Sequence, residues 1–340
     1  MRPLQTGRSR AGDRPVNPFT RPRLFAAAFT LAALAPTSAG AEIAPEARAV
    51  VERYVQAIGG REALAAVHAL RLRGAITTMG LSGTHESWRE MPDRTREAAV
   101  LGPYRLGGGF DGRTAWRVGP DGKLSQLDGK DLEDARAGAY FDDSGWLAAD
   151  QAGGRVDYLG TRQDSTGQYT VLEVAPPVGH PRELWFDPAS GLLARMVEPQ
   201  NRPPVVSDLG DYRAFEGLRF PTRTVVHMVG MPANTLSSTL DSVTVNPPLP
   251  PGFFSPPDSG RSSVRYLKTP GRAEVALRYA EHLLWIRVSI DGAPPVDFLL
   301  DSGASISVVD SSYAASIGLK TAGDAQTNGA GASDAHRSRR

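Results

Sequence analysis

The chain has 340 residues, of which 41% are hydrophobic and 22% are charged, and this composition is ordinary for a soluble globular protein of about two domains. It contains no cysteine, which excludes disulfide bonds, thiolate metal sites, cysteine nucleophiles and a lipid-modified N-terminal cysteine. The formal net charge is +1, and the 36 glycines and 27 prolines favour β structure with many turns over a helical bundle.

The first 41 residues have the pattern of a signal peptide. Six arginines precede the apolar run Leu24–Ala35, which is shorter than the ~20 residues that span a bilayer. Pro36 ends the run, and Ala39-Gly40-Ala41 forms an A-x-A cleavage site. The alternatives are an Arg-rich organelle-targeting peptide and an uncleaved anchor. We predict export and cleavage after residue 41, which gives a periplasmic or secreted protein without a membrane anchor.

Cleavage at this position changes the charge balance. It removes six arginines and one aspartate and leaves 32 basic and 36 acidic residues. A net charge near −4 gives no electrostatic reason to expect nucleic-acid binding, so we predict no nucleic-acid partner. The six histidines show no metal-binding spacing, and we expect no metal and no cofactor.

The residues after the signal peptide predict a helix followed by many strands. Apolar residues at 47, 50, 51, 54, 55 and 58 predict a helix that ends at Gly59-Gly60, and a second short helix is predicted from Arg61 to about Val67. Roughly ten turn-bounded strands follow from about Leu70, interrupted at Leu132–Gln151 by a helical or irregular segment. The predicted fold class is mainly β, with an N-terminal helix and a curved antiparallel half-barrel around a helix or a cavity.

Residues 42–256 resemble the periplasmic lipoprotein carriers of the outer-membrane lipoprotein-sorting family. The resemblance rests on the opening helix ending in AIGG, the segments FDGRTAW and LWFDPASGLLARM, and the segments DYRAFEGLRFPTRT and TVNPPLPPGFFSPP. It implies a half-barrel around an apolar cavity, with a lipid or another apolar molecule as the ligand. The alternative is a scaffold that has no ligand of its own.

A Pro-rich stretch, Asn246–Pro257, indicates the end of this domain, and a linker is predicted over residues 257–273. Residues 274–340 form the next predicted domain. They predict strands and a tight turn, followed by a short helix that Ser311 or Ser312 would cap.

The tight turn holds the main candidate for a catalytic residue. Asp-Ser-Gly occurs at 143–145, 258–260 and 301–303, and the tripeptide alone is ordinary turn chemistry. Only the third copy lies between two hydrophobic strands, FLL before it and ISVV after it. We therefore expect Asp301 to be buried and either hydrogen-bonded or paired with a second titratable group. The alternative is a buried structural turn.

This part of the chain is similar to the single-domain retropepsin-like aspartic peptidases, through FLLDSGAS, the helix ending in SIGLK, and NGAGAS. The resemblance implies that Asp301 is catalytic and that the substrate is a peptide or protein. Each such unit supplies one aspartate, so the resemblance also implies that catalysis needs a homodimer. It assigns the active-site loop to Ser302, Gly303 and Ala304, and the start of the flap to Gly329 and Gly331.

Only 39 residues follow Asp301, fewer than the rest of the sheet, the flap and the dimer strands of this family require. We therefore expect an incomplete all-β acid-protease-like domain with little activity. The sequence predicts an exported aspartic-type endopeptidase behind a carrier-like domain. The alternative is a periplasmic protein that binds a lipid or another apolar ligand and whose peptidase unit is vestigial.

Overall fold

The computed structural model describes residues 42–120, 122–199, 203–257, 266–269, 272–301, 307–320, 324–327 and 336–339. The predicted signal peptide lies outside these ranges. No helix in the described ranges is long and apolar enough to cross a membrane.

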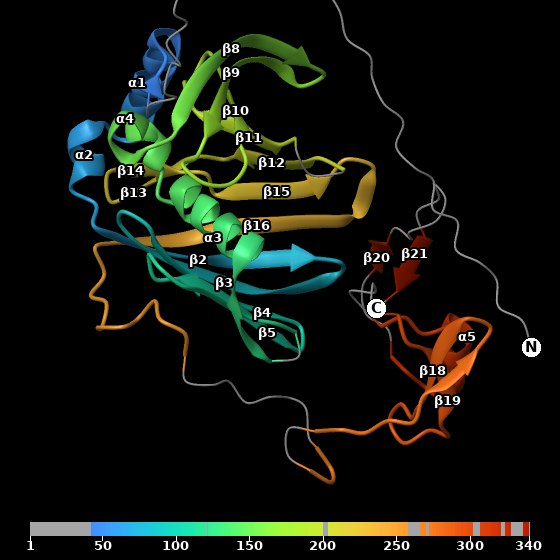
Figure 1. Ribbon diagram of the computed structural model, residues 1–340. Helices are drawn as coiled ribbons and strands as arrows, with labels where there is room; N and C mark the ends of the chain where they lie inside the picture. Colours follow the sequence, from blue (N-terminus) through green and yellow to red (C-terminus); the bar gives the residue numbers. More distant parts are fainter. Residues whose placement is uncertain are drawn as a thin grey trace, which may run out of the picture. The chain divides into compact units, whose positions relative to one another are not determined.

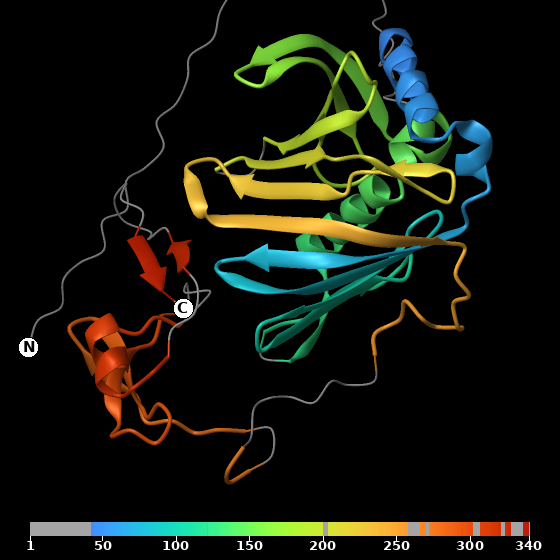
Figure 2. The same ribbon diagram turned by 180° about the vertical axis from the view of Figure 1, so that it is seen from behind.

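One curved sheet dominates the described chain (Figures 1 and 2). Its strand order is β1-β8-β9-β10-β11-β12-β15-β16-β2-β3-β4-β5-β6-β7, and the sheet is not closed. All neighbours pair antiparallel except β1 and β8, which are parallel. The strands are β1 (Glu42–Ile43), β2 (Ala69–Thr78), β3 (Leu81–Glu90), β4 (Arg94–Leu101), β5 (Tyr104–Phe110), β6 (Ala115–Val118), β7 (Leu124–Leu127), β8 (Arg155–Asp164), β9 (Gly167–Ala175), β10 (Arg182–Phe186), β11 (Leu193–Glu198), β12 (Val205–Gly210), β15 (Arg223–Met228) and β16 (Met231–Val245). The predicted fold class, mainly β with a curved antiparallel sheet, is confirmed.

Helices cover parts of this sheet, and their positions follow the sequence patterns closely. The first predicted helix is α1 (Pro45–Ile58), and the second is α2 (Arg61–Ala65). The segment predicted as helical or irregular contains α3 (Gly129–Asp142), the 3-10 helix η1 (Gly145–Ala148) and α4 (Ala149–Ala152). Gly59 ends α1 with φ of +139°, and a Cβ atom there would lie 2.9 Å from the Gly217 carbonyl oxygen. Both the backbone angle and the close approach therefore require glycine at this position.

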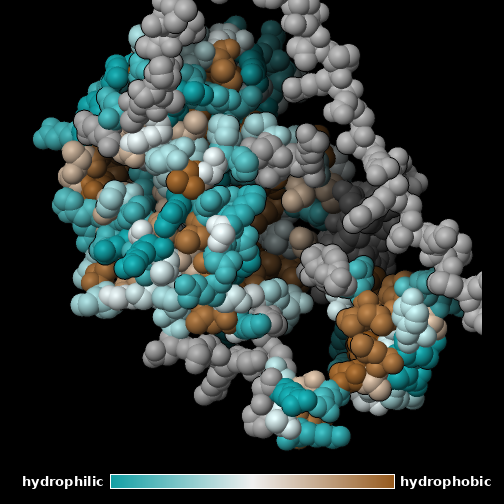
Figure 3. Space-filling view, in the orientation of Figure 1, coloured by the Kyte–Doolittle hydropathy of each residue, from teal (hydrophilic) through white to brown (hydrophobic). Residues whose placement is uncertain are grey.

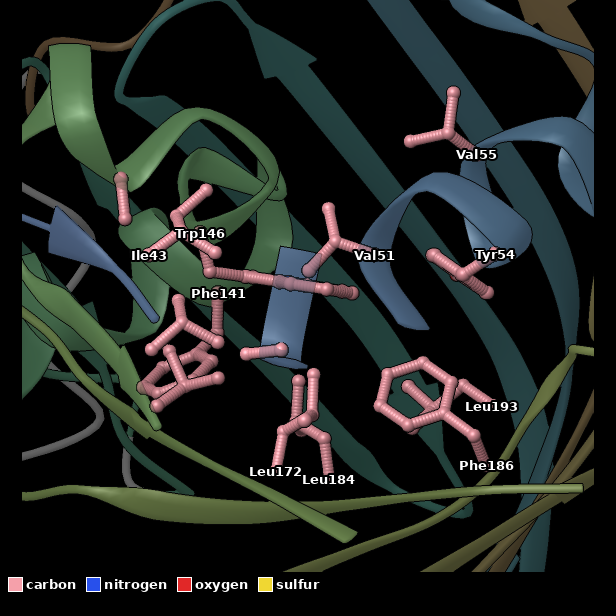
Figure 4. Close-up of a cluster of buried hydrophobic side chains, with 14 of the residues drawn as sticks. Ile43, Val51, Tyr54, Val55, Phe141, Trp146, Leu172, Leu184, Phe186 and Leu193 are labelled. Carbon is pink, nitrogen blue, oxygen red and sulfur yellow. The ribbon is translucent and has the colours of Figure 1, made fainter. Parts of the chain in front are cut away.

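The main hydrophobic core lies between α1 and strands β8 to β11 (Figure 4). The predicted apolar stripe of α1 faces this core, because Ala47, Val51, Tyr54, Val55 and Ile58 are all buried. On the sheet side the core contains Val156, Leu172, Val174, Leu184, Phe186 and Leu193. A second, smaller cluster lies at the other end of the sheet, where α3 packs on β5 and β6 through Ala139, Phe110 and Ala115.

The Pro-rich stretch after β16 packs against the sheet through its two phenylalanines. Phe254 is buried, and its carbonyl oxygen accepts a hydrogen bond of 2.9 Å from Nε1 of Trp116. The Phe253 ring lies edge-on to Trp88, with 5.4 Å between the ring centroids, and the Arg96 guanidinium lies over it at 4.7 Å. Residues up to at least 254 thus pack with the large sheet.

We expect Phe254→Ala to lower the free energy of unfolding by about 3 kcal/mol, because it removes a buried aromatic side chain and leaves a cavity. Leu159→Ala, at a position that is 38% exposed, serves as the control and should cost far less. Denaturant unfolding measures both variants. Equal losses in the two would show that the Pro-rich stretch contributes nothing to the stability of the sheet.

Three smaller groups of strands complete the described structure. The first is the hairpin β13 (Arg213–Phe215) and β14 (Leu218–Phe220). The second is a three-stranded antiparallel sheet of β17 (Arg278–Ala280), β18 (Leu283–Val288) and β19 (Val296–Leu299), which the short helix α5 (Ser311–Ser316) follows in the chain. The third is the pair β20 (Asp324–Thr327) and β21 (His336–Arg339).

The predicted cap of the C-terminal helix is wrong by one residue. The Asp310 side chain caps α5, because its oxygen accepts hydrogen bonds of 3.0 Å from the backbone N–H groups of Ser312 and Tyr313. Ser311 and Ser312 are instead the first two residues of the helix. A carboxylate competes well with a hydroxyl for this position, since it also complements the positive end of the helix dipole.

Candidate functional site

The large sheet holds a cavity of about 940 Å³. Its lining residues come from α1, from the α3–η1 segment, and from strands β2, β3, β4, β10, β11, β12, β15 and β16. This volume lies in the range of sites that enclose small organic ligands.

Most of the cavity wall is apolar. Aliphatic and aromatic side chains from the sheet and from the covering helices share this wall: Tyr54, Ile58, Leu70, Leu72, Trp146, Leu184, Leu193, Met196, Leu209 and Leu240. An apolar ligand in contact with this wall would leave water, which is the main favourable contribution to binding at such sites.

Polar side chains gather at the part of the cavity formed by β3, β4 and the end of α3, which we term the polar end. His85, Ser87 and Arg89 of β3 line it, together with Glu97 of β4 and with Asp142 and Asp143 at the end of α3. Arg89 donates from Nη1 to the backbone carbonyl oxygen of Asp142, and its Nη2 lies 3.4 Å from the carboxylate of the same residue. Arg89 therefore connects the C-terminal end of α3 to the sheet, where the helix dipole favours a cation.

Asp143 is a buried acid at the polar end. Burial raises the pKa of its carboxyl group to about 8; Arg89 opposes this rise, and Asp142 and Asp93 add to it. Both carboxylate oxygens are buried and have no hydrogen-bond partner among the described residues. An ionised carboxylate without partners is costly in such a place, so the neutral form is favoured.

Glu97 and His85 are also shifted toward their neutral forms. Burial raises the pKa of Glu97, and the nearby Asp142 raises it further while Arg89 lowers it. The Glu97 residue is nevertheless exposed to solvent, because it borders the cavity. Burial and the positive charge of Arg89 lower the pKa of His85, so this imidazole is neutral at pH 7. The polar end thus holds more acidic groups than its cations balance.

The raised pKa of Asp143 predicts a pH-dependent stability. Between pH 4 and 8 the folded protein keeps a proton that the unfolded chain releases, so the free energy of unfolding falls as the pH rises through this window. Asp143→Asn removes this dependence. Relative to the wild type, we expect the variant to gain up to about 5 kcal/mol between pH 4 and pH 8.

The charged groups that face Asp143 are Arg89, Asp142 and Asp93, and all of them are retained in the variant. Urea unfolding at the two pH values measures the gain. Asp131→Asn, at an exposed position of α3, is the matched control and should gain nothing. If Asp143→Asn changes the free energy of unfolding by the same amount at both pH values, Asp143 is not a buried, protonated acid.

The sequence-predicted catalytic residue lies in the C-terminal three-stranded sheet. Asp301 follows β19 directly after Leu300, whose backbone N–H donates to the Leu284 carbonyl oxygen at 2.8 Å. Asp301 is exposed, and so are Leu299 (45%) and Leu300 (47%). The expectation that Asp301 is buried is therefore wrong, because no described residue covers the apolar run that precedes it.

Ser302, Gly303 and Ala304 of the predicted active-site loop, and Gly329 and Gly331 of the predicted flap, lie outside the described residues. The nearest described carboxylate in the strand is Asp297, which contacts Arg278 at 2.8 Å and Arg287 at 3.2 Å. These two arginines hold the pKa of Asp297 below its usual value. The catalytic roles of the loop stay a prediction.

The described residues contain no group of three or more His, Asp or Glu side chains that could hold a metal ion. The polar end of the cavity was not identified from the sequence. A signal for it exists in THESWRE, where His85, Ser87 and Arg89 occupy alternate positions of one strand. Alternation places all three on the same face, and the intervening Trp88 marks the other face as the one that carries an aromatic side chain.

Comparisons with known proteins give results for both parts of the chain. The family model described as aspartyl protease matches residues 286–340. Among solved structures, this chain is similar to an outer-membrane lipoprotein-sorting protein domain from Vibrio parahaemolyticus, with 10% identity and a TM-score of 0.41 over 61% of this chain and 95% of that chain. It is also similar to a LolA superfamily protein from Nitrosomonas europaea, with 12% identity and a TM-score of 0.43 over 61% of this chain and 96% of that chain.

A third similar structure is a DUF1329 family protein from Desulfovibrio piger, with 9% identity and a TM-score of 0.42 over 61% of this chain and 96% of that chain. No curated protein matches this chain. The two resemblances identified in the sequence, to lipoprotein-sorting domains and to aspartic peptidases, thus both recur in the comparisons.

Proposed function

We propose that residues 42–256 form a domain that binds an apolar ligand, and that a linker over residues 257–273 joins it to an aspartic-peptidase-like unit over residues 274–340. The protein acts outside the cytoplasm, in the periplasm or as a secreted protein. The observation that carries the binding function is the cavity of about 940 Å³ with its largely apolar wall.

The apolar wall accounts for affinity without a specific contact. Each methylene group that leaves water contributes about 0.8 kcal/mol, so a chain of eight such groups gains about 6 kcal/mol before the costs of association. Lipid chains and other elongated apolar molecules have this composition. They are the ligand class that the wall fits best.

A bulky substitution on the cavity face should block this binding. Ser207 of β12 lines the cavity, whereas its neighbour Val206 is not among the lining residues and lies on the other face of the strand. We expect Ser207→Trp to weaken binding of the apolar fluorescent dye N-phenyl-1-naphthylamine at least ten-fold, and Val206→Trp to leave it unchanged. Fluorescence titration measures both. Equal binding by the two variants, or no dye binding by the wild type, would contradict the proposal.

A second function, aspartic-type endopeptidase activity, is proposed for the C-terminal unit. It is supported by the aspartyl protease family match over residues 286–340, which includes Asp301. It is also supported by exposed apolar side chains in the same part of the chain, which shows apolar surface in the space-filling view (Figure 3): Leu283, Leu284, Leu299, Leu300 and Val308. Exposed apolar surface of this kind suits a unit that is covered by a second copy or by further strands.

The proposed chemistry uses one Asp301 from each copy of a homodimer. Two carboxylates close together cannot both ionise, so they share a proton. One carboxylate then acts as general base on a water molecule, and the other protonates the peptide group that the water attacks. Ser302, Gly303 and Ala304 would form the loop around the aspartates, and Gly329 and Gly331 would begin the flap over the peptide substrate.

Replacement of the aspartate tests this second function. We expect Asp301→Asn to abolish whatever cleavage of a peptide library the protein shows. Asn keeps the shape of the side chain but cannot share the proton. Asp291→Asn, in the turn between β18 and β19, is the matched control and should keep full activity. Full activity of the Asp301→Asn variant would end the peptidase proposal.

A further inference from the structure

We propose that the polar end of the cavity binds the ammonium group of an amphiphilic amine, whose apolar chain lies along the leucine-rich wall. This inference rests on the proposed ligand-binding function of the cavity and specifies its ligand class. The residue that would contact the ammonium group is Glu97.

The charges that line the polar end leave room for one more cation. Four carboxyl groups line the cavity here, on Asp93, Glu97, Asp142 and Asp143, against the guanidinium groups of Arg89 and Arg136. Of the two other arginines that line the cavity, Arg73 pairs with Glu86 and Arg219 belongs to β14. Arg89 is already engaged with Asp142 and with the end of α3. The Glu97 side chain makes no ion pair or hydrogen bond within the described part of the chain. A cationic group of a ligand could therefore pair with the Glu97 carboxylate.

The backbone geometry directs Glu97 into the cavity. Its neighbour Arg96 packs against Phe253 and Trp116 on the opposite face of β4, so alternation places Glu97 on the cavity face. Gly108 of β5 pairs directly with Glu97 and therefore has no side chain to cover it. A Cβ atom added at Gly108 would approach only the Trp116 carbonyl oxygen, at 3.4 Å. The space beside the carboxylate is thus open to a ligand group.

Electrostatics favour an ammonium group over other head groups at this place. Burial is the main cause of the raised pKa values of Glu97 and Asp143, and the neighbouring Asp142 raises both further while Arg89 opposes the rise. An ammonium group would supply positive charge and would donate hydrogen bonds to Glu97, and bonds of this charge-assisted kind are the strong ones. An anionic head group would meet several acids, and both Nη groups of Arg89 are directed at Asp142, which leaves only its buried Nε without a partner. Asp143 does not contact the ligand, because its oxygens are buried.

The apolar chain of the ligand has a continuous path from this head-group position. The wall begins on β2, the neighbour of β3, with Leu70 and Leu72, and continues on β16 with Leu240. A linear chain that starts at Glu97 crosses β3 and reaches this wall. A single ligand can therefore satisfy the polar end and the apolar wall together.

Calorimetric titration of the full chain with three matched ligands at pH 7, each below its micelle concentration, tests the proposal. The ligands are dodecylamine, dodecanol and dodecanoate, which share the chain length and differ in the head group. We expect dodecylamine to bind at least ten-fold more tightly than dodecanol, and dodecanoate to bind most weakly. Glu97→Gln should remove the advantage of the amine over the alcohol, and Glu97→Asp should retain most of it.

Glu133→Gln, at an exposed position of α3 outside the cavity, makes the same chemical change and should leave all three affinities as in the wild type. Thermal unfolding checks that the Glu97 variants are folded. If dodecanol binds the wild type as tightly as dodecylamine, or if Glu97→Gln keeps the amine preference, the inference is wrong although the apolar cavity still binds. If none of the three ligands binds, the proposed ligand-binding function fails as well.

Discussion

The organisation of the large sheet and its helices depends on one constraint: the curved sheet has a larger inner face than the helices can cover. Helix α1 covers the part formed by β8 to β11, where its apolar stripe completes the main core. Helix α3 covers the part formed by β5 and β6 through a separate small cluster. Strands β12, β15, β16 and β2 lie between these two parts in the sheet and contribute to the cavity wall. The cavity is therefore a consequence of incomplete coverage by two helices, and it is apolar because the inner face of such a sheet is apolar.

The polar end lies where the C-terminal end of α3 meets strand β3. The free carbonyl groups at the end of the helix need donors, and Arg89 supplies one to Asp142. Asp142 and Asp143, at the end of the helix, lie close enough to Arg89 to interact with its charge. Since one guanidinium cannot balance these carboxyl groups together with Glu97, some of them hold protons instead. A structural requirement of α3 thus creates an acidic position inside an otherwise apolar cavity.

Local sequence patterns predict the helices and strands of this fold well. The cavity and the exposure of Asp301 depend on non-local packing, which these patterns do not contain. The 3.6-residue periodicity at 47–58 and the glycine at 59 are local signals, and α1 follows them from its first buried residue to its last. The cavity required knowledge of which faces the helices leave uncovered, and no stretch of sequence contains that. The burial of Asp301 was inferred from its apolar flanks, but burial depends on what packs against a strand. Leu299 and Leu300 form the expected strand end and remain exposed all the same.

The Asp-Ser-Gly copy at residues 143–145 and the aspartate of the copy at 301–303 show why the tripeptide alone could not locate a buried acid. At residues 143–145 the aspartate follows α3, Ser144 adopts a left-handed conformation with φ of +56°, and Gly145 packs so closely on the Tyr140 ring that a Cβ atom would lie 2.7 Å from it. The Asp143 oxygens are buried here, and this burial raises the pKa of their carboxyl group. Asp301 begins the same tripeptide after a strand and is exposed. Environment, rather than motif, decides the state of such a carboxyl group. At residues 143–145 it places a carboxyl group with a raised pKa beside the apolar cavity that we propose as the ligand site.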